Sequence, residues 1–301
     1  MQSQPEALWP QVRRVTATAL ECGAAQPIPT ELRTIEDGGV RFLIRIATTP
    51  SRKPTSSEKP PSKIGSARGV NPFLPYDPAL YVSDIGPDHI CLLNKYNVVD
   101  HHVLIVSRTF QAQSELLGKR DFWALSHCLA EYDSLGFHNS GAVAGASQPH
   151  RHLQLIPLPL VDSPSKLPLE PLFLEAFDRP GMSRTRQNAV QSDRLSFPHR
   201  LARFDESMFA SPADAADLIH VIYRAMLSDL NLDTVKPCPY NLLVSRRWML
   251  MVPRLREYFQ SISLNSLAFA GVFFVRHREY YDQLTDAGPF QALRQVTRKS
   301  D

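Results

Sequence analysis

Apolar and polar positions alternate with a period of two in several short stretches, a pattern typical of strands with one buried face. Residues 1 to about 46 predict a helix and then extended segments, with a turn at residues 36–40 before the stretch RFLIRIA. Three strand-like runs at residues 80–85, 89–96 and 101–107 are spaced as an antiparallel meander. Residues 240–254 predict a hairpin with Arg246 and Arg247 at its turn.

Apolar residues at helical spacing predict two helices in the interior of the chain. The first lies between residues 118 and 136, and Gly136 is placed to end it. The second begins at Ser211, whose hydroxyl can cap it, with Pro212 in its first turn. Its expected buried stripe consists of Ile219, Ile222, Met226 and Leu230.

The remaining segments are less regular. Residues 49–69 are rich in Pro, Ser and Lys and predict a loop, while residues 164–205 are poorly patterned and are expected to wrap the surface. An apolar helix is expected from about residue 266, followed by an amphipathic C-terminal piece. Strand meanders followed by helices, in two successive rounds, predict an α+β fold with antiparallel sheets.

Composition and charge narrow the possible partners. The chain of 301 residues has 33 basic and 30 acidic residues that are well mixed, so a small anionic ligand is favoured over polymeric nucleic acid. Its longest apolar run near the C-terminus, SLAFAGVFFV, is too short to span a bilayer core of about 30 Å. The N-terminus lacks the apolar region of a signal peptide, so we expect a cytoplasmic protein that contacts no membrane.

The segment GASQPHRHLQLIP carries the most distinctive chemistry. If it is a strand, His150, His152 and Gln154 point to one face, while Arg151 and the following leucines point to the other. Such a pair of histidines can be structural. It can also share a zinc ion on a strand, provided that a further ligand comes from His102, His138 or His199.

The loop before the histidines supports a third interpretation. In NSGAVAGASQ, small residues let the backbone approach a ligand and turn amide N–H groups toward an anion, and Ser147 adds a hydroxyl donor. A phosphate held beside a neutral imidazole can be attacked at phosphorus, and the phosphoimidazolium that forms can pass the group to a second acceptor. The loop and the histidine row together therefore suggest covalent phosphoryl-group transfer.

These segments, together with LLNKYNVVDHHVLIVSR, PYNLLVSRRWMLMVPR and SLNSLAFAGVFFV, resemble the diadenosine tetraphosphate phosphorylases, also called ATP adenylyltransferases. That family belongs to the galactose-1-phosphate uridylyltransferase branch of the histidine-triad (HIT) superfamily. The resemblance runs from about residue 41 to 293, and its most specific part is S-Q-x-H-x-H-x-Q. It implies a HIT-like antiparallel sheet with flanking helices and two HIT-like halves in one chain. Residues 1–160 would form the catalytic half, and residues 161–301 would complete the nucleotide site.

The resemblance also implies roles for the motif residues. His152 would be the nucleophile that takes AMP from a dinucleotide, His150 would orient or support it, and Gln154 would hydrogen-bond the phosphoryl group. The hydrolases of the superfamily have a third histidine at the last position, so Gln154 goes with transfer to an acceptor other than water.

Substrate-binding residues are implied at five further places. Lys53 matches a family lysine, although Lys59 is a second candidate. Arg276 is a candidate for facing the phosphates. The polyphosphate loop, the LNK segment and the C-terminal NS segment contribute the rest: Asn139, Gly145, Ala146, Ser147, Gln148, Asn94, Lys95, Asn265 and Ser266.

The implied reaction is a reversible phosphorolysis of diadenosine tetraphosphate to ATP and ADP through a covalent AMP–histidine intermediate. The partners would be the dinucleoside polyphosphate, ATP, ADP and inorganic phosphate. Mg²⁺ would bridge the substrate phosphates, with no metal site built by the protein. The alternatives are a hydrolase or a nucleotide-sugar transferase with the same nucleophile, and a nucleotide sensor without turnover.

Overall fold

The computed structural model describes residues 6–48, 71–178, 189–234 and 238–297. Its N-terminal part confirms the predicted order: helix α1 (Leu8–Glu21) precedes strands β1 (Thr30–Asp37) and β2 (Val40–Ala47), which pair antiparallel. The predicted loop at residues 49–69 lies outside the described residues.

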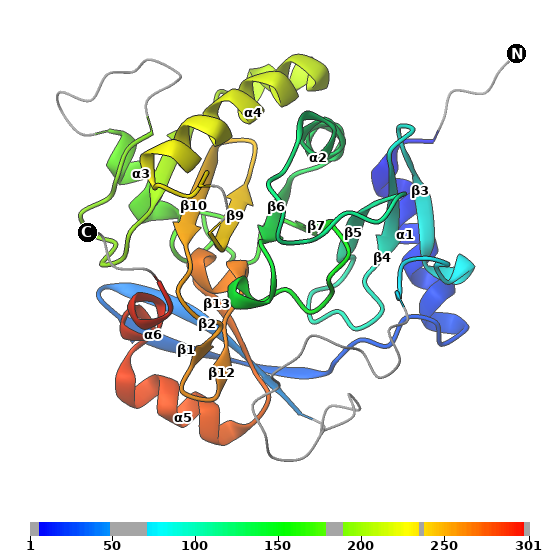
Figure 1. Ribbon diagram of the computed structural model, residues 1–301. Coiled ribbons are helices and arrows are strands. Elements are labelled where there is room, and N and C mark those ends of the chain that lie inside the picture. Colours follow the sequence, from blue (N-terminus) through cyan, green and yellow to red (C-terminus); the bar gives the residue numbers. More distant parts are fainter. Residues whose placement is uncertain (1–5, 49–70, 179–188, 235–237, 298–301) are drawn as a thin grey trace, which may run out of the picture.

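An eight-stranded sheet forms the centre of the molecule (Figure 1). Its order is β3-β4-β5-β7-β6-β9-β10-β8, and each neighbouring pair is antiparallel. The predicted meander and hairpin are confirmed within it. The strands are β3 (Tyr81–Ile85), β4 (His89–Leu93), β5 (Val103–Ser107), β6 (Ser134–Asn139), β7 (His152–Pro157), β8 (Arg200–Arg203), β9 (Tyr240–Val244) and β10 (Trp248–Pro253).

Two layers cover this sheet on opposite faces. Helices α2 (Lys119–Glu131) and α4 (Pro212–Asp229) pack together on one face, and α1 joins their apolar core (Figure 1). The other face carries a three-stranded sheet of β1, β2 and β13 (Val272–Val275), backed by α5 (Arg278–Ala287) and α6 (Pro289–Val296). A small hairpin, β11 (Tyr258–Phe259) with β12 (Ile262–Ser263), adjoins α6. The expected α+β fold is therefore confirmed.

The predicted helix end at Gly136 is wrong. Helix α2 ends at Glu131, and Gly136 lies inside strand β6. A Cβ atom at position 136 would lie 2.5 Å from Cδ1 of Leu125, so glycine lets α2 pack closely on the sheet. The glycine serves packing in a strand, and sequence spacing alone did not distinguish this from a helix terminus.

The second helix begins where predicted, and three residues of its expected stripe are buried; the fourth, Leu230, is half-buried at the C-terminal end. The Ser211 hydroxyl does not cap a backbone N–H of this helix. It instead donates to the Asp214 carboxylate at 2.7 Å. Pro212 occupies the first helical position, where the absence of an N–H costs no hydrogen bond.

The segment at residues 164–205 contributes to the core, contrary to expectation. It includes α3 (Glu170–Phe177) and edge strand β8, and both Phe173 and Phe197 are buried. The Trp248 indole donates to the buried carboxylate of Glu170 at 2.9 Å, which fastens α3 to β10. Because the segment inserts apolar side chains from short, dissimilar elements, no sustained period marks it as buried.

The apolar helix expected from residue 266 is also wrong. Ser266–Ala270 form one short 3₁₀ helix, and Gly271, at φ +91°, turns the chain into strand β13. Strand β13 pairs parallel with β2, so the smaller sheet is not purely antiparallel. A Cβ atom at Gly271 would lie 2.5 Å from Cβ of Pro168, which accounts for glycine there.

Strands from both sides of the predicted boundary at residues 160 and 161 share each of these sheets. β6 pairs with β9 in the large sheet, and β2 pairs with β13 in the small one. The division into two HIT-like halves at this boundary stays a prediction. Within the described ranges, no helix has both the length and the apolar character that crossing a bilayer requires.

Candidate active site

His152 stands at the start of β7, between β5 and β6, and its imidazole is buried. Its Nδ1 atom lies 2.8 Å from the His150 carbonyl oxygen. Since a carbonyl can only accept, Nδ1 carries the proton and Nε2 keeps its lone pair. Burial lowers the pKa of His152 to about 4, so the ring is neutral near pH 7.

His150 lies two residues before β7, and its backbone forms an isolated β-bridge with Ala112. Its Nε2 donates to the Ser107 carbonyl at 2.8 Å, and its Nδ1 accepts from the Asn71 amide at 2.7 Å. The two histidines are thus held as opposite tautomers. Burial also lowers the pKa of His150. The phenyl ring of Phe73 contacts both imidazoles, at centroid distances of 5.8 and 5.3 Å.

The predicted alternation of faces along β7 is confirmed. Leu153 and Leu155 pack in the core under α2 and α4, whereas Ile156 packs against the three-stranded sheet. His152 and Gln154 share the face of Ile156. Gln154 is paired with Phe137 in the sheet. Burial lowers the pKa of the nearby His102 to about 4, and the side-chain hydrogen bond between Gln154 and His102 raises it by a smaller amount.

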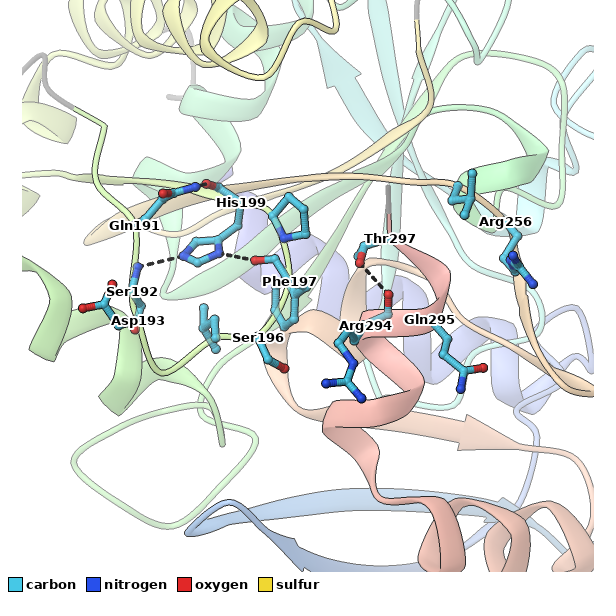
Figure 2. Close-up of a pocket in the computed structure, with 13 residues that line it drawn as sticks. Gln191, Ser192, Asp193, Ser196, Phe197, His199, Arg256, Arg294, Gln295 and Thr297 are labelled. Carbon is cyan, nitrogen blue, oxygen red and sulfur yellow. Dashed lines mark hydrogen bonds between the residues drawn. The ribbon is translucent and has the colours of Figure 1, made fainter. Parts of the chain in front are cut away.

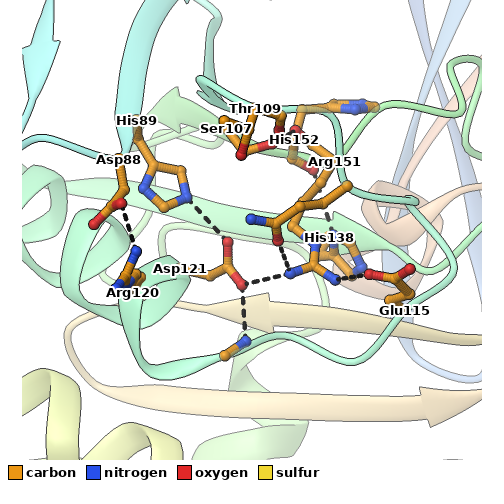
Figure 3. Close-up of polar contacts among 12 residues, drawn as sticks. Asp88, His89, Ser107, Thr109, Glu115, Arg120, Asp121, His138, Arg151 and His152 are labelled. Carbon is orange, nitrogen blue, oxygen red and sulfur yellow. Dashed lines mark hydrogen bonds and ion pairs between the residues drawn. The ribbon is translucent and has the colours of Figure 1, made fainter.

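Arg151 points to the opposite face, where it enters a buried charge network (Figure 3). Its guanidinium lies 3.2 Å from the Asp121 carboxylate, which also accepts from Nε2 of His89 at 3.0 Å. Burial raises the pKa of Asp121, but the hydrogen bond from His89 and the charge of Arg151 outweigh it and leave a lowered pKa. This network connects the residue before β7 to Asp121 of α2, on the sheet face opposite the histidines.

The loop between β6 and β7 is shaped by two glycines. Ala142–Ala144 form a single 3₁₀ turn between Gly141, at φ +77°, and Gly145, at φ +90°. The N–H groups of Gly145 and Ala146 donate within the loop, to the carbonyls of Ala142 and Gly141. These two amides are therefore not directed at a ligand here.

The next two residues of the loop carry donors that no other described residue occupies. Within the described residues, neither the backbone N–H nor the side chain of Ser147 or Gln148 makes a hydrogen bond. Ser147 is exposed and Gln148 is half-buried. The loop's available donors thus lie immediately before the histidines.

Asn139 and Ser266 are brought into direct contact across 127 positions. The Asn139 side-chain oxygen accepts from the Ser266 N–H at 2.9 Å and the Ser266 hydroxyl at 2.7 Å. It also accepts from the Asn241 amide at 2.8 Å. Asn265 caps the following 3₁₀ helix through the N–H of Leu267. The loop and the C-terminal segment thus adjoin, while their contacts with substrate stay a prediction.

Arg254 and Asn241 are site residues that we did not select from the sequence. The buried guanidinium of Arg254 donates to the carbonyls of Ala144 at 3.3 Å, Leu264 at 3.0 Å and Val296 at 3.3 Å, and to the side-chain oxygen of Asn241. Burial lowers its pKa to about 9. A single polar residue inside the apolar runs YNLLV and MLMVPR was the available signal.

The remaining candidates lie outside the motif segment. The Asn94 amide is 3.1 Å from Nδ1 of His102, and Lys95 Nζ lies 5.8 Å from the ring centre of Tyr96. Arg276 is exposed after β13, and within the described residues no hydrogen bond or ion pair joins it to the motif. Lys53 and its alternative Lys59 lie outside the described residues.

The fit to a metal ion can be tested on the described residues. They contain no group of three His, Cys, Asp or Glu side chains that could hold an ion, so the zinc interpretation lacks its ligands there. Of the three proposed third ligands, His199 is occupied with Ser192 and Phe197 (Figure 2). A cation held by substrate phosphates needs no such group.

A cavity of about 740 Å³ lies away from the motif, lined by residues 191–193 and 195–199 together with Arg256 and Arg294 (Figure 2). None of the residues predicted to act in catalysis or to bind substrate lines it. Its buried His199 accepts from the Ser192 N–H at 2.9 Å and donates to the Phe197 carbonyl at 2.8 Å, so that imidazole braces the wall.

Comparison with known proteins shows matches over most of the chain. The family model of the Ap4A phosphorylase N-terminal domain matches residues 1–175, and that of the ATP adenylyltransferase C-terminal domain matches residues 193–299. The chain is 25% identical over 270 residues to diadenosine 5',5'''-P1,P4-tetraphosphate phosphorylase 2 of Saccharomyces cerevisiae, covering 82% of this chain and 79% of the relative. Protein APA1 of the same yeast is 27% identical over 212 residues, 65% of this chain and 64% of APA1.

The fold agrees with these matches. The crystal structure of yeast Ap4A phosphorylase Apa2 in complex with Ap4A superposes with a TM-score of 0.77 at 22% identity, covering 97% of each chain. The first family model spans more than half of the sequence, and the second covers most of the remainder. The chain belongs to the Ap4A phosphorylase family.

Proposed function

We propose that this protein is a cytoplasmic nucleotidyltransferase that cleaves diadenosine tetraphosphate (Ap4A) with inorganic phosphate, giving ATP and ADP. Membership of the Ap4A phosphorylase family supports this activity. The observation that carries the mechanism is the 2.8 Å contact from His152 Nδ1 to the His150 carbonyl, because it leaves Nε2 unprotonated.

In the first step, Nε2 of His152 attacks the phosphorus that carries one adenosine. A P–N bond forms as the P–O bond to the remaining three phosphates breaks, so ATP leaves and AMP stays on the histidine. The ring gains positive charge during the attack, and its Nδ1–H donates more strongly to the His150 carbonyl. Asn71 and Ser107 hold His150, and thereby its carbonyl, in place.

In the second step, an oxygen of inorganic phosphate attacks the same phosphorus. The P–N bond breaks, ADP leaves, and Nε2 regains its lone pair. In this proposal the amide of Gln154 donates to the phosphoryl oxygens, and the open donors of Ser147 and Gln148 bind the phosphate chain. Asn94, Lys95, Asn265, Arg276 and Lys53 would contribute farther along the substrate.

We expect a divalent cation, Mg²⁺, to accompany the substrate. When bound, it would neutralise charge on the phosphates that leave as ATP. No group of three His, Cys, Asp or Glu side chains in the described residues competes for it, so the cation would be held by the phosphates. Chelation should therefore abolish turnover without lowering the thermal stability of the free protein.

The test is chromatography of products after incubation with Ap4A and Mg²⁺, with and without inorganic phosphate. ATP and ADP formed only with phosphate would support the phosphorylase. ATP and AMP formed regardless of phosphate would identify a hydrolase instead. Ap4A binding without any product, at protein concentrations sufficient for one turnover, would identify a sensor and overturn the proposal.

A further inference from the structure

The ladder between β6 and β7 stops short of the site. Its last paired residues are Phe137 and Gln154. Continuing this register by two residues would set Asn139 opposite His152, but these two are not paired. The strands therefore part where one ends in the loop and the other begins with the nucleophile.

The side-chain amide of Gln113 lies in this opening and is buried. Its oxygen accepts from the His152 N–H at 2.8 Å. Its nitrogen donates to the carbonyls of Asn139, at 3.0 Å, and His152, at 3.1 Å. One side chain thus bonds three backbone groups from both strands, and it supplies the partner of the buried His152 N–H.

Gln113 is itself fixed to the motif through its backbone. Its N–H donates to the Pro149 carbonyl at 2.8 Å, and the adjacent Ala112 bridges His150. Two residues earlier, the Gln111 carbonyl accepts from the Arg151 N–H at 2.8 Å. On the outer side, the Arg151 guanidinium bonds the Leu116 carbonyl at 3.1 Å and lies 3.3 Å from Glu115 (Figure 3). The segment that carries Gln113 is therefore fixed to the motif by residues before and after position 113.

We propose that Gln113 is a positioning residue that sets the spacing between the His152 imidazole and the loop that begins after Asn139. This inference rests on the proposed function, in which the imidazole attacks a phosphorus held by that loop. Attack requires the reacting atoms to approach to about 3–3.5 Å, and a displacement of about 1 Å can cost about 10²-fold in rate. An amide suits the position because it offers one acceptor and two donor hydrogens to one N–H and two carbonyls.

Three variants separate the parts of this role. Gln113→Leu removes all three hydrogen bonds, whereas Gln113→Glu retains the acceptor and places a carboxylate against two carbonyl oxygens. Gln113→Asn retains both chemical functions on a shorter side chain and should recover part of the lost rate. Tyr223→Phe is the stability control, since it removes a buried hydroxyl that bonds Tyr240 and the Leu117 N–H and has no hydrogen bond to His150 or His152.

The first readout is the single-turnover release of ATP from Ap4A without phosphate, measured well below the unfolding temperature of each variant. We expect Gln113→Leu to slow this step by about 10²-fold while the KM for Ap4A changes little. Tyr223→Phe should transfer AMP at the wild-type rate. A Leu variant with the wild-type rate, or a loss of rate that tracks stability equally in Tyr223→Phe, would overturn the proposal.

The second readout is independent of turnover. Amide hydrogen exchange at His152 should accelerate at least tenfold in Gln113→Leu, because Gln113 Oε1 is the partner of that N–H. Exchange in β10 should stay unchanged. If the wild type transfers no AMP, the proposed function is refuted. If hydrogen exchange at the His152 amide is unchanged in Gln113→Leu, the positioning of His152 by Gln113 is refuted. The two failures are thus distinguishable.

Discussion

The carbonyl oxygen of Leu264 packs directly against Gly145, such that a Cβ atom at position 145 would lie 2.7 Å from it. The same Cβ atom would lie 3.0 Å from Cα of Asn265. The Leu264 carbonyl also accepts from Arg254 at 3.0 Å. The glycine loop, the C-terminal segment and the buried guanidinium are therefore in successive contact, which couples the loop geometry to residues far along the chain.

Gly145→Ala should disturb this contact as well as the backbone. The residue has φ +90°, and we expect the variant to lose about 3 kcal/mol of unfolding free energy and to bind Ap4A more weakly. Gly23→Ala is the matched control, because Gly23 has φ +76° with nothing within 4 Å of a Cβ atom. It should lose only about 1 kcal/mol. Equal losses in urea denaturation would contradict a role for the Leu264 contact.

Arg254→Met should be strongly destabilising. The substitution removes the side-chain donor of the Leu264 and Arg256 carbonyls and of the Asn241 side-chain oxygen, and we expect a loss of about 3–5 kcal/mol in chemical denaturation. Arg256→Met, on an exposed side chain of the same segment, should change stability by less than about 0.5 kcal/mol. Similar unfolding midpoints for the two variants would show that the buried donor network is dispensable.

His152→Ala should abolish AMP transfer while the fold persists. Loss of a nucleophile removes the covalent route, so we expect single-turnover ATP release to fall by at least about 10³-fold. His277→Ala, at an exposed histidine before α5, should leave that rate unchanged. A His152→Ala enzyme with substantial turnover would assign the nucleophile elsewhere.

The rate of AMP transfer should be nearly independent of pH from about 5.5 to 8. Only the neutral imidazole attacks, and burial lowers the pKa of His152 to about 4. A free histidine would instead titrate near a pKa of about 6.5. A pH series of the single-turnover rate checks this, and an inflection near pH 6.5 assigned to His152 would contradict its burial.

Stability should decline as the pH falls from about 6.5 toward 4. Burial lowers the pKa of His102, His152 and His199 to about 4 and that of His138 to about 3. In this window the unfolded chain binds more protons, so unfolding free energy rises with pH by up to about 1.4 kcal/mol per unit for each histidine. His199→Gln should make the dependence of the urea midpoint shallower, and an unchanged slope would argue against this account.

Several elements could be predicted because their signals are local. Period-two alternation placed the meander, the hairpin and the two faces of β7, and a proline beside Ser211 located the start of α4. The errors have one source. Gly136 inside β6, the buried segment with Phe173 and Phe197, and strand β13 after Gly271 depend on close packing between elements distant in sequence, which local spacing does not report.

The sequence alone determined the residue types of the site: two imidazoles and an amide in alternation after a loop of small residues. This motif could be interpreted from the sequence because the alternation of side chains along a strand is regular. Only the tertiary structure decided how these groups are used. It assigned the tautomer of His150 through the Ser107 carbonyl and that of His152 through the His150 carbonyl. It also showed that the Gly145 and Ala146 amides donate to carbonyls of their own loop. It also joined Gln113, Asn241 and Arg254 to the site. The reason is that a buried hydrogen-bonding group must find a partner within about 3 Å, wherever in the chain that partner lies.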